Sequence, residues 1–359
     1  MRHGRRPRER GVALLLVLWV FVALGVLALD FSQYIRDDAL AATNFKEEAE
    51  GYYVALAGMN HALFLAQQRR ERGGVDELDA PDLRRGIGRE ARTEQEELEQ
   101  LSEADGQWHE GTFAGMKYRV RMEDEGGKIA LNYIQGPLLT RIVTNLIQRG
   151  DATRAINVHV QHDLQVIVNS ILDWRDTDNL LRQDGAENEY YLNQRPPHRA
   201  KNGLFDSPDE LLMVRGMTRE LFYGSNGVPG LRDIVSVYSR SPRINIRTAP
   251  AAVLQVLLNT DPTQATDMVT GRGEDKLTFL PRIKAQVGAV DPQIAELLHE
   301  DEARIVMLEG RADVSRERNQ ASVAAVVDLS GEGAEGVRII RWLDRAPRSL
   351  ELPTMTGVL

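Results

Sequence analysis

The chain has 359 residues, 42% of them hydrophobic and 27% charged, which is typical of a folded protein and leaves room for two folding units. Its net charge of −9 argues against a broad nucleic-acid-binding surface, because such a surface needs clustered positive charge. The lack of cysteine excludes disulfides, thiolate nucleophiles and soft-metal sites.

The N-terminus joins a basic leader, residues 1–11, to an uncharged apolar run, residues 12–29. Such a run is just long enough to span a bilayer as a helix, and the arginines before it favour a cytoplasmic leader with the remaining chain outside the cytoplasm. No small-residue cleavage site of a secretory signal follows at Asp30. The junction of Gly11 and Val12 is instead similar to the leader of type IV prepilins and type II secretion pseudopilins, which a membrane peptidase cuts after glycine.

Apolar residues recur every three or four positions from Phe45 through Tyr52 and Leu56 to Leu63, and no proline lies between Pro7 and Pro81. This pattern predicts a helix with one buried stripe. Two arrangements fit it. One is a continuous helix from Val12 to about Arg70, and the other is a membrane anchor followed by a separate soluble helix.

Alternating residues predict the strands. We expect one hairpin from residues 117–123 and 129–133 and another from residues 322–329 and 337–343. Because an isolated hairpin is marginally stable, the two are expected to share one antiparallel sheet packed on the long helix. The polar residues 73–111 are interpreted as a loop or short solvated helix, and residues 135–310 show helical periodicity. The fold class is therefore α+β with a large inserted all-α domain.

Carboxylates crowd the segment 170–191. They are Asp173, Asp176, Asp178, Asp184, Glu187 and Glu189. Oxygen ligands in a flexible loop suit Ca²⁺, although the spacing is not that of an EF-hand. The alternative is a solvated acidic loop. Acid–base catalysis by paired carboxylates is not expected, because nothing nearby supplies a substrate platform.

Residues 202–224 predict two short helices capped at Ser207 and Thr218, in the manner of a helix-hairpin-helix unit. Residues 243–258 resemble a degenerate second copy. Such units often hold DNA phosphates at a glycine-rich turn, but here the second glycine is missing and the surroundings are acidic. A protein-interaction module is the favoured interpretation.

No nucleophile, zinc, P-loop or dinucleotide motif is present, so an enzyme is not predicted. His159 and His162 are three residues apart and could share a helix face. A structural or solvent-facing role is favoured for them over a metal site.

The leader, the long helix and the segments LNYI, ILDWRDTD, GAENEYY, SPDELLMVRGMT and INIRTAPAAVL occur in this order. Together they resemble the K-type minor pseudopilin of type II secretion systems, from Gly11 to about Leu258. The resemblance implies a pilin-like domain formed by residues 12–134 and 311–359, interrupted by a helical domain, residues 135–310. It also implies a cleaved leader, residues 1–11, and an N-methylated Val12.

The same resemblance implies a subunit that caps the tip of a periplasmic pseudopilus and helps to initiate its assembly. It would be anchored in the inner membrane by a single span, with I-type and J-type minor pseudopilins as partners and the prepilin peptidase as processing enzyme. No nucleic acid is expected. Leu16, the fifth residue after the cut, stands where other pseudopilins have glutamate, which suits a tip subunit. An exposed stripe of Ala42, Phe45, Ala49, Tyr52 and Leu56 is expected to contact the partners.

The family binds calcium through regions matching 173–178 and 185–191, so Asp173, Asp176, Asp178, Glu187 and Glu189 are the candidate ligands. Two features depart from the family: the chain has no disulfide, and the acidic segment 73–111 is long. The alternative function is a membrane-anchored helix-hairpin-helix protein for DNA binding or uptake.

Overall fold

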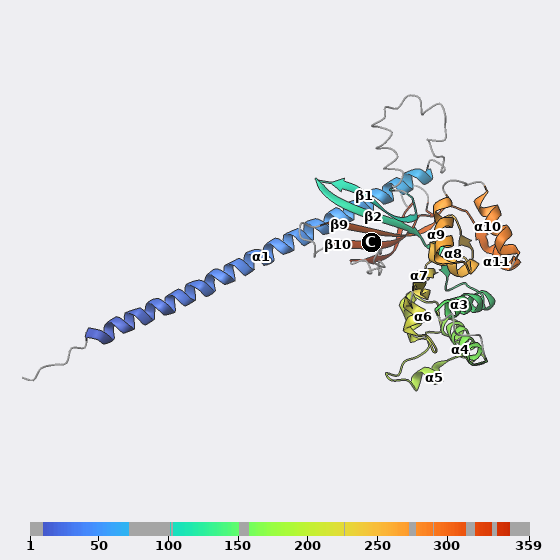
Figure 1. Ribbon diagram of the computed structural model, residues 1–359, viewed down its shortest axis with the longest axis horizontal. Coiled ribbons are helices and arrows are strands. Elements are labelled where there is room, and N and C mark those ends of the chain that lie inside the picture. The colour runs from blue at the N-terminus through green and yellow to red at the C-terminus, as the bar shows by residue number, and fades with distance from the viewer. Residues whose placement is uncertain are drawn as a thin grey trace, which may run out of the picture.

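The computed structural model describes residues 10–71, 101, 103–150, 158–225, 227–272, 278–289, 291–313, 320–331 and 336–344. It contains one long helix, a five-stranded antiparallel sheet and a group of short helices gathered beyond one end of the sheet (Figure 1). The α+β fold with a long N-terminal helix packed on a small sheet is confirmed.

The first helix, α1 (Arg10–Glu71), is continuous over 62 residues. At 1.5 Å per residue it is about 93 Å long. Its N-terminal part includes an 18-residue window of mean hydropathy 2.7 with none of it buried, so by length and composition it could cross a membrane. Of the two arrangements left open by the sequence, the continuous helix is the correct one.

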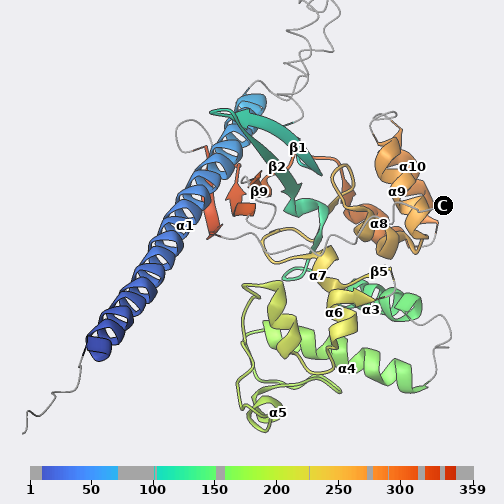
Figure 2. The ribbon, with the colours of Figure 1, turned by 60° about the vertical axis from the view of Figure 1, so that its left-hand side comes forward.

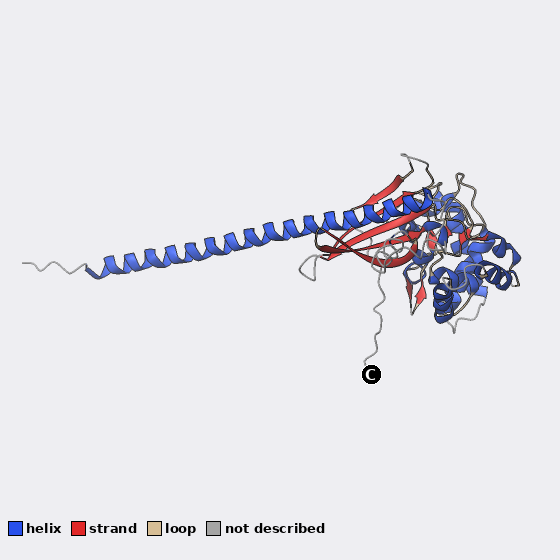
Figure 3. Ribbon diagram, turned by 90° about the horizontal axis from the view of Figure 1, so that it is seen from above, coloured by secondary structure: helices blue, strands red, loops and turns tan. Residues whose placement is uncertain are grey.

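The C-terminal part of α1 packs along the sheet, as Figure 3 shows, against β2, β9 and β10. The side of the helix that meets the sheet carries small residues, with Ala55, Ala62 and Ala66 buried. Helix and strand backbones meet so closely that a Cβ on Gly310 of β9 would lie 2.4 Å from the carbonyl oxygen of Ala55. The predicted buried stripe is only partly right, because its first residue, Phe45, is 75% exposed.

The sheet has the strand order β1-β2-β9-β10-β11, and every neighbouring pair is antiparallel. A two-residue turn, Ala114 and Gly115 with φ of 51° and 79°, joins the first two strands, as the twist of a hairpin favours. The strands are β1 (Asp105–Phe113), β2 (Met116–Asp124), β9 (Ile305–Asp313), β10 (Gln320–Asp328) and β11 (Arg338–Leu343).

The C-terminal hairpin is confirmed, since β10 pairs with β11. The other predicted hairpin is wrong: β2 pairs with β1, which the sequence analysis had placed in a loop. Asp124 ends β2 and caps a 3-10 helix, η3 (Glu125–Gly127), accepting a hydrogen bond from the Gly126 amide at 2.8 Å. The chain thereby leaves the sheet instead of reversing. The rest of the acidic segment up to residue 100 lies outside the described residues.

We call residues 125–304, between β2 and β9, the helical unit. Its beginning and end lie side by side, because Asp124 of β2 is paired with Val306 of β9. Residues 305–310, expected to be helical, are strand and need correction. Residues 305–308 form a short continuous apolar run, IVML, from which periodicity alone cannot distinguish a buried strand from a buried helix.

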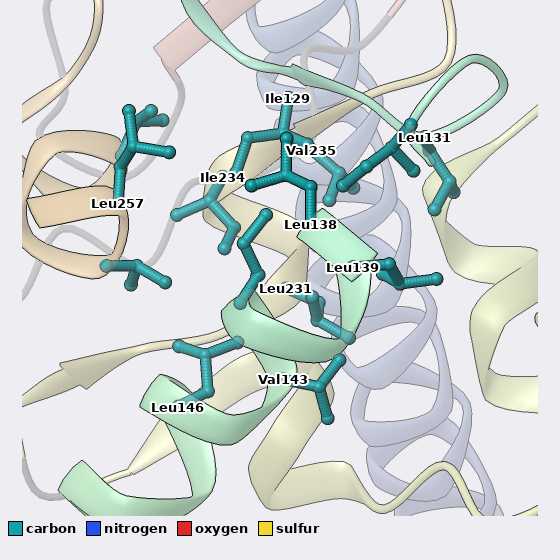
Figure 4. Packing of buried hydrophobic residues seen from close by; sticks show 14 of the residues in the cluster. Ile129, Leu131, Leu138, Leu139, Val143, Leu146, Leu231, Ile234, Val235 and Leu257 are labelled. Atoms are coloured by element: carbon teal, nitrogen blue, oxygen red, sulfur yellow. The ribbon is translucent and has the colours of Figure 1, made fainter. Parts of the chain in front are cut away.

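The helical unit has its own hydrophobic core, which extends from Ile129 to Leu298 and is separate from the cluster between α1 and the sheet. In Figure 4, Leu139, Val143 and Leu146 of α3 lie close to Leu231. The α-helices are α3 (Gly136–Gly150), α4 (Val158–Arg175), α5 (Asn188–Leu192), α6 (Arg219–Tyr223), α7 (Leu231–Ile234), α8 (Ala251–Leu258), α9 (Pro262–Gly271), α10 (Phe279–Gly288) and α11 (Pro292–Leu297).

The helical unit also contains short two-stranded pairs. They are β3 (Ile129–Ala130) with β6 (Val235–Ser236), β4 (Gly224–Ser225) with β5 (Val228–Pro229), and β7 (Ile244–Asn245) with β8 (Leu298–His299).

The helix-hairpin-helix interpretation of residues 202–224 is only partly right. The caps at Ser207 and Thr218 are confirmed, the first with a complete capping box. The first helix, however, is a 3-10 helix, η4 (Pro208–Met213), and α6 has only five residues. The second segment, residues 243–258, contains the short strand β7 and the helix α8, whose N-cap residue Pro250 makes no side-chain capping hydrogen bond.

Candidate metal centre

The carboxylates of the predicted cation loop come from the end of α4 and the start of α5. Asp173, in the last turn of α4, is completely buried, and Asp176 follows one residue after the helix. The loop returns so that Glu187 is the N-cap residue of α5. Figure 2 shows α5 at the end of the helical unit that is farther from the sheet.

The reversal of this loop depends on one glycine. Asp184 has φ of 61°, and Gly185 follows it. A Cβ on Gly185 would lie 2.0 Å from Oδ2 of Asp173. Only glycine therefore allows the returning chain to approach the buried carboxylate, and the amide of Ala186 then donates a 3.0 Å hydrogen bond to the same oxygen.

Three of the five predicted ligands come together. Carboxylate oxygens of Asp173, Asp176 and Glu187 all lie within 4.8 Å of one another. Glu187 is 5% exposed, and neither of its oxygens has a hydrogen-bond partner; Oδ1 of Asp176 has none either. Burial, followed by the charges of Asp173 and Asp176, raises the pKa of Glu187 to about 7.

The side chain of one arginine partly balances these negative charges. Arg182 donates to Oδ1 of Asp173 at 2.7 Å and forms an ion pair with Asp176, but it leaves Glu187 without a partner. Burial raises the pKa of Asp173 despite this arginine. Three carboxylates facing one arginine leave a net negative, oxygen-rich site, as a hard divalent cation requires.

The other two predicted ligands lie apart from this group. The side chains of Asp178 and Glu189 are exposed, and Oδ1 of Asp178 accepts a 2.8 Å hydrogen bond from the amide of Leu180. His162 lies 3.8 Å from Asp184 and outside the carboxylate group, while the side chain of His159 lies outside the described residues.

A set of amide side chains that the sequence analysis missed holds the loop in place. Asn202, with φ of 47°, donates to the carbonyl oxygen of Asp178 at 2.7 Å and to Oδ1 of Asn179 at 3.0 Å. Asn188 donates to the same Asn179 oxygen at 2.6 Å. The contacts of Asn202 join segments more than twenty residues apart, so no local pattern could have indicated them.

Aromatic rings at the end of α4 and in α5 pack together beside the site. Trp174 and Tyr191 meet edge to face with ring centroids 5.1 Å apart, and His198 packs against both. The Tyr191 hydroxyl accepts a hydrogen bond from the Arg215 amide at 3.3 Å. The rings therefore fix the end of α4 relative to α5, which carry the three carboxylates.

The carboxylate loop lies in a segment whose sequence is similar to that of known proteins. Residues 141–224 match the family described as type II secretion system (T2SS), protein K. The chain is 26% identical over 285 residues to type II secretion system protein K of Pseudomonas aeruginosa PAO1, which covers 77% of this chain and 74% of that protein. The chain is thus similar in sequence to type II secretion system protein K.

The likeness to protein K extends to the fold. The crystal structure of the GspK-GspI-GspJ complex from the enterotoxigenic Escherichia coli type 2 secretion system contains a chain that matches with a TM-score of 0.50 and 17% identity. The match covers 77% of this chain and all of that one. The residues predicted for processing and assembly of a protein K relative, Gly11, Val12 and Leu16, all lie at the beginning of α1.

Proposed function

We propose that this chain is a non-enzymatic minor pseudopilin that caps the tip of a periplasmic type II secretion pseudopilus. The observation that carries the proposal is the combination of a continuous 62-residue α1, apolar in its first part and packed on a sheet in its last, with the protein K segment 141–224. A pilin-like filament subunit needs both an N-terminal helix that can lie in the membrane before assembly and a globular domain outside the membrane.

The N-terminus supports the proposed processing and location. In this proposal the apolar run of α1 crosses the inner membrane, the basic leader stays in the cytoplasm and the helical unit and sheet lie in the periplasm. The prepilin peptidase would cut between Gly11 and Val12. Leu16 is exposed on α1, where a glutamate of other pseudopilins would stand.

The proposed partners are I-type and J-type minor pseudopilins, as in the E. coli complex. Between residues 40 and 71, α1 leaves three aromatic side chains more than half exposed: Phe45 is 75% exposed, Tyr53 66% and Phe64 59%. The alanines at 55, 62 and 66 are already covered by the sheet, so these rings supply apolar area for neighbouring helices. A specific interface of this kind buries roughly 800 Å² per partner.

Co-purification tests this function. The full-length chain, in detergent, is co-expressed with the I-like and J-like pseudopilins encoded beside it. We expect a ternary complex that the double variant Tyr53→Ser with Phe64→Ser weakens at least tenfold. Phe113→Ser, which alters a ring of β1 that is 52% exposed, is the control and should leave the complex intact. Elution of three separate proteins at micromolar concentration would refute the proposal.

We further propose that Asp173, Asp176 and Glu187 bind Ca²⁺, with Asp178 and Glu189 as candidates for the outer positions. The unpartnered, buried oxygens of Glu187 support this, because a buried carboxylate is costly without a cation. Ca²⁺ takes six to eight oxygens in flexible geometry, so carbonyl groups and water would complete the shell. The ion would join the end of α4 to the start of α5.

The alternative of a membrane-anchored DNA-binding protein has less support. It requires paired helices around a glycine-rich turn, whereas the described part of residues 202–258 holds a 3-10 helix and α-helices of five, four and eight residues. Binding of the full-length protein to duplex DNA at physiological salt would favour this alternative.

A further inference from the structure

A cavity of about 350 Å³ lies where the chain passes between the sheet and the helical unit. Both crossings form its wall: Asp124 and Gly126 at the end of β2, and several residues between His299 and Ile305 before β9. The loop after β6, residues 239–243, closes another side. None of the carboxylates of the candidate metal centre lines this cavity, so it is a separate feature.

Three carboxylates of the wall, two of them exposed and one buried, are paired with arginines. Asp301 pairs with Arg243 at 3.2 Å, Glu302 with Arg70 at 3.9 Å and Asp328 with Arg338 at 3.0 Å. Their negative charge is therefore largely balanced by the protein itself.

Asp124 is balanced differently. It is buried and accepts hydrogen bonds from Asn245 at 2.8 Å, from Thr248 at 2.7 Å and from the Gly126 amide at 2.8 Å. Burial raises its pKa in spite of these bonds. Its carboxylate thus faces its own donors and adds little negative charge to the cavity.

Two arginines of the wall have no such partner. The side chains of Arg240 and Arg304 are exposed and make no ion pair within the described part of the chain. The pKa of the neighbouring His299 is lowered first by burial and then by the positive charge of Arg243, while the charge of Asp301 opposes the shift and Arg304 contributes less. Arg240 and Arg304 therefore bring to the wall two positive charges that no carboxylate of the described residues pairs with.

We propose that this cavity binds a soluble, multivalent oxyanion such as phosphate between Arg240 and Arg304. A guanidinium group presents several N–H donors in a plane and recognises oxyanions in bidentate fashion. Ser241 also lines the cavity; its hydroxyl accepts from the Arg243 amide at 3.2 Å and keeps its own proton to donate. The bound anion would connect the loop after β6 to the crossing before β9.

The position of the cavity excludes headgroups of the membrane that α1 is proposed to cross. Glu302 in the wall contacts Arg70 in the last turn of α1, whereas the apolar run ends at Leu29. Forty-one residues of helix correspond to about 60 Å. The anion must therefore come from solution.

Thermal unfolding of the full-length protein in an uncharged detergent tests the proposal. Sodium phosphate is titrated against sodium chloride at matched ionic strength. We expect a saturable rise in Tm of about 3 to 6 °C when phosphate reaches ten times its Kd. The rise should disappear in Arg240→Gln with Arg304→Gln. It should persist in Arg195→Gln with Arg199→Gln, which removes the same charge from exposed positions that do not line the cavity.

Two results would overturn the proposal: no rise beyond that in chloride, or the same rise in both double variants, which would place the anion elsewhere. If the cavity double variant does not fold, ³¹P NMR line broadening is compared between the unaltered protein and Arg304→Gln alone. Equal broadening would then count against the site, and loss of broadening would support it.

Discussion

Replacing Glu187 with glutamine should stabilise the protein when no divalent cation is present and abolish its response to calcium. The first effect has the opposite sign to that of most buried substitutions. It follows from the two partnerless oxygens of Glu187, which lie among Asp173 and Asp176 in a buried site. Glutamine keeps the shape and removes the charge.

The magnitude follows from the pKa. The group has a pKa of about 7 in the folded protein against an ordinary value of 4.5, a difference worth about 3 kcal/mol at high pH. Because the folded-state pKa is the higher one, the penalty is absent below pH 4.5, grows between pH 4.5 and 7 and is complete above pH 7. Glu187→Gln should remove it and raise Tm by roughly 5 to 10 °C at pH 8, but hardly at all at pH 4.5.

Calcium should act only on the charged form. For the unaltered protein, calcium at a hundred times its Kd adds about 2.7 kcal/mol of stability at pH 8. The apparent affinity should fall about tenfold between pH 8 and pH 6, where the carboxylate of Glu187 is mostly protonated. Magnesium should have a smaller effect, since it demands stricter octahedral geometry.

The assay is thermal unfolding of the full-length protein in chelator, in millimolar calcium and in millimolar magnesium, at pH 4.5, 6 and 8. Glu296→Gln, an exposed residue of α11, is the matched control and should change neither Tm nor the calcium response. A lower Tm for Glu187→Gln in chelator at pH 8, or a calcium response that survives the substitution, would refute the reasoning.

Two further predictions concern α1. Gly310→Ala should destabilise the protein by about 1–3 kcal/mol, since its Cβ would meet the carbonyl oxygen of Ala55 at 2.4 Å, whereas Gly271→Ala, with nothing within 4 Å, should be neutral in the same urea titration. Substitution of Gly11 by leucine should leave the leader attached. Intact mass should then show a chain that starts at Met1 in the variant and at a methylated Val12 in the unaltered protein. The same N-terminal residue in both proteins would contradict the proposed processing.

Local patterns in the sequence were sufficient for some elements of the fold. The lack of proline allowed a continuous α1 but left a break after the membrane anchor equally open, whereas alternation predicted β2, β10 and β11. The edge strand β1 was missed because its two glycines and many polar residues hide the alternation. The pairing of β2 with β9 joins residues far apart in the chain, and nothing local specifies it.

The candidate metal centre shows the same division. The crowding of carboxylates pointed to the correct loop, but which of them converge depends on where α5 begins. With Glu187 at its N-cap, Glu189 falls in the first helical turn and lies in solvent. Arg182 and Asn202 reach the site from loops whose course no periodic pattern describes.

Because Asp124 and Val306 are paired neighbours, a short turn could in principle take the place of the whole helical unit without changing the sheet. Neighbouring antiparallel residues are about 5 Å apart, which a two-residue turn also spans. Closing a loop of about 180 residues costs only about 4 kcal/mol more than closing such a turn, and the helical unit has a hydrophobic core of its own to offset that cost. Its size and surface can therefore diverge between relatives while the strand register beside α1 stays unchanged.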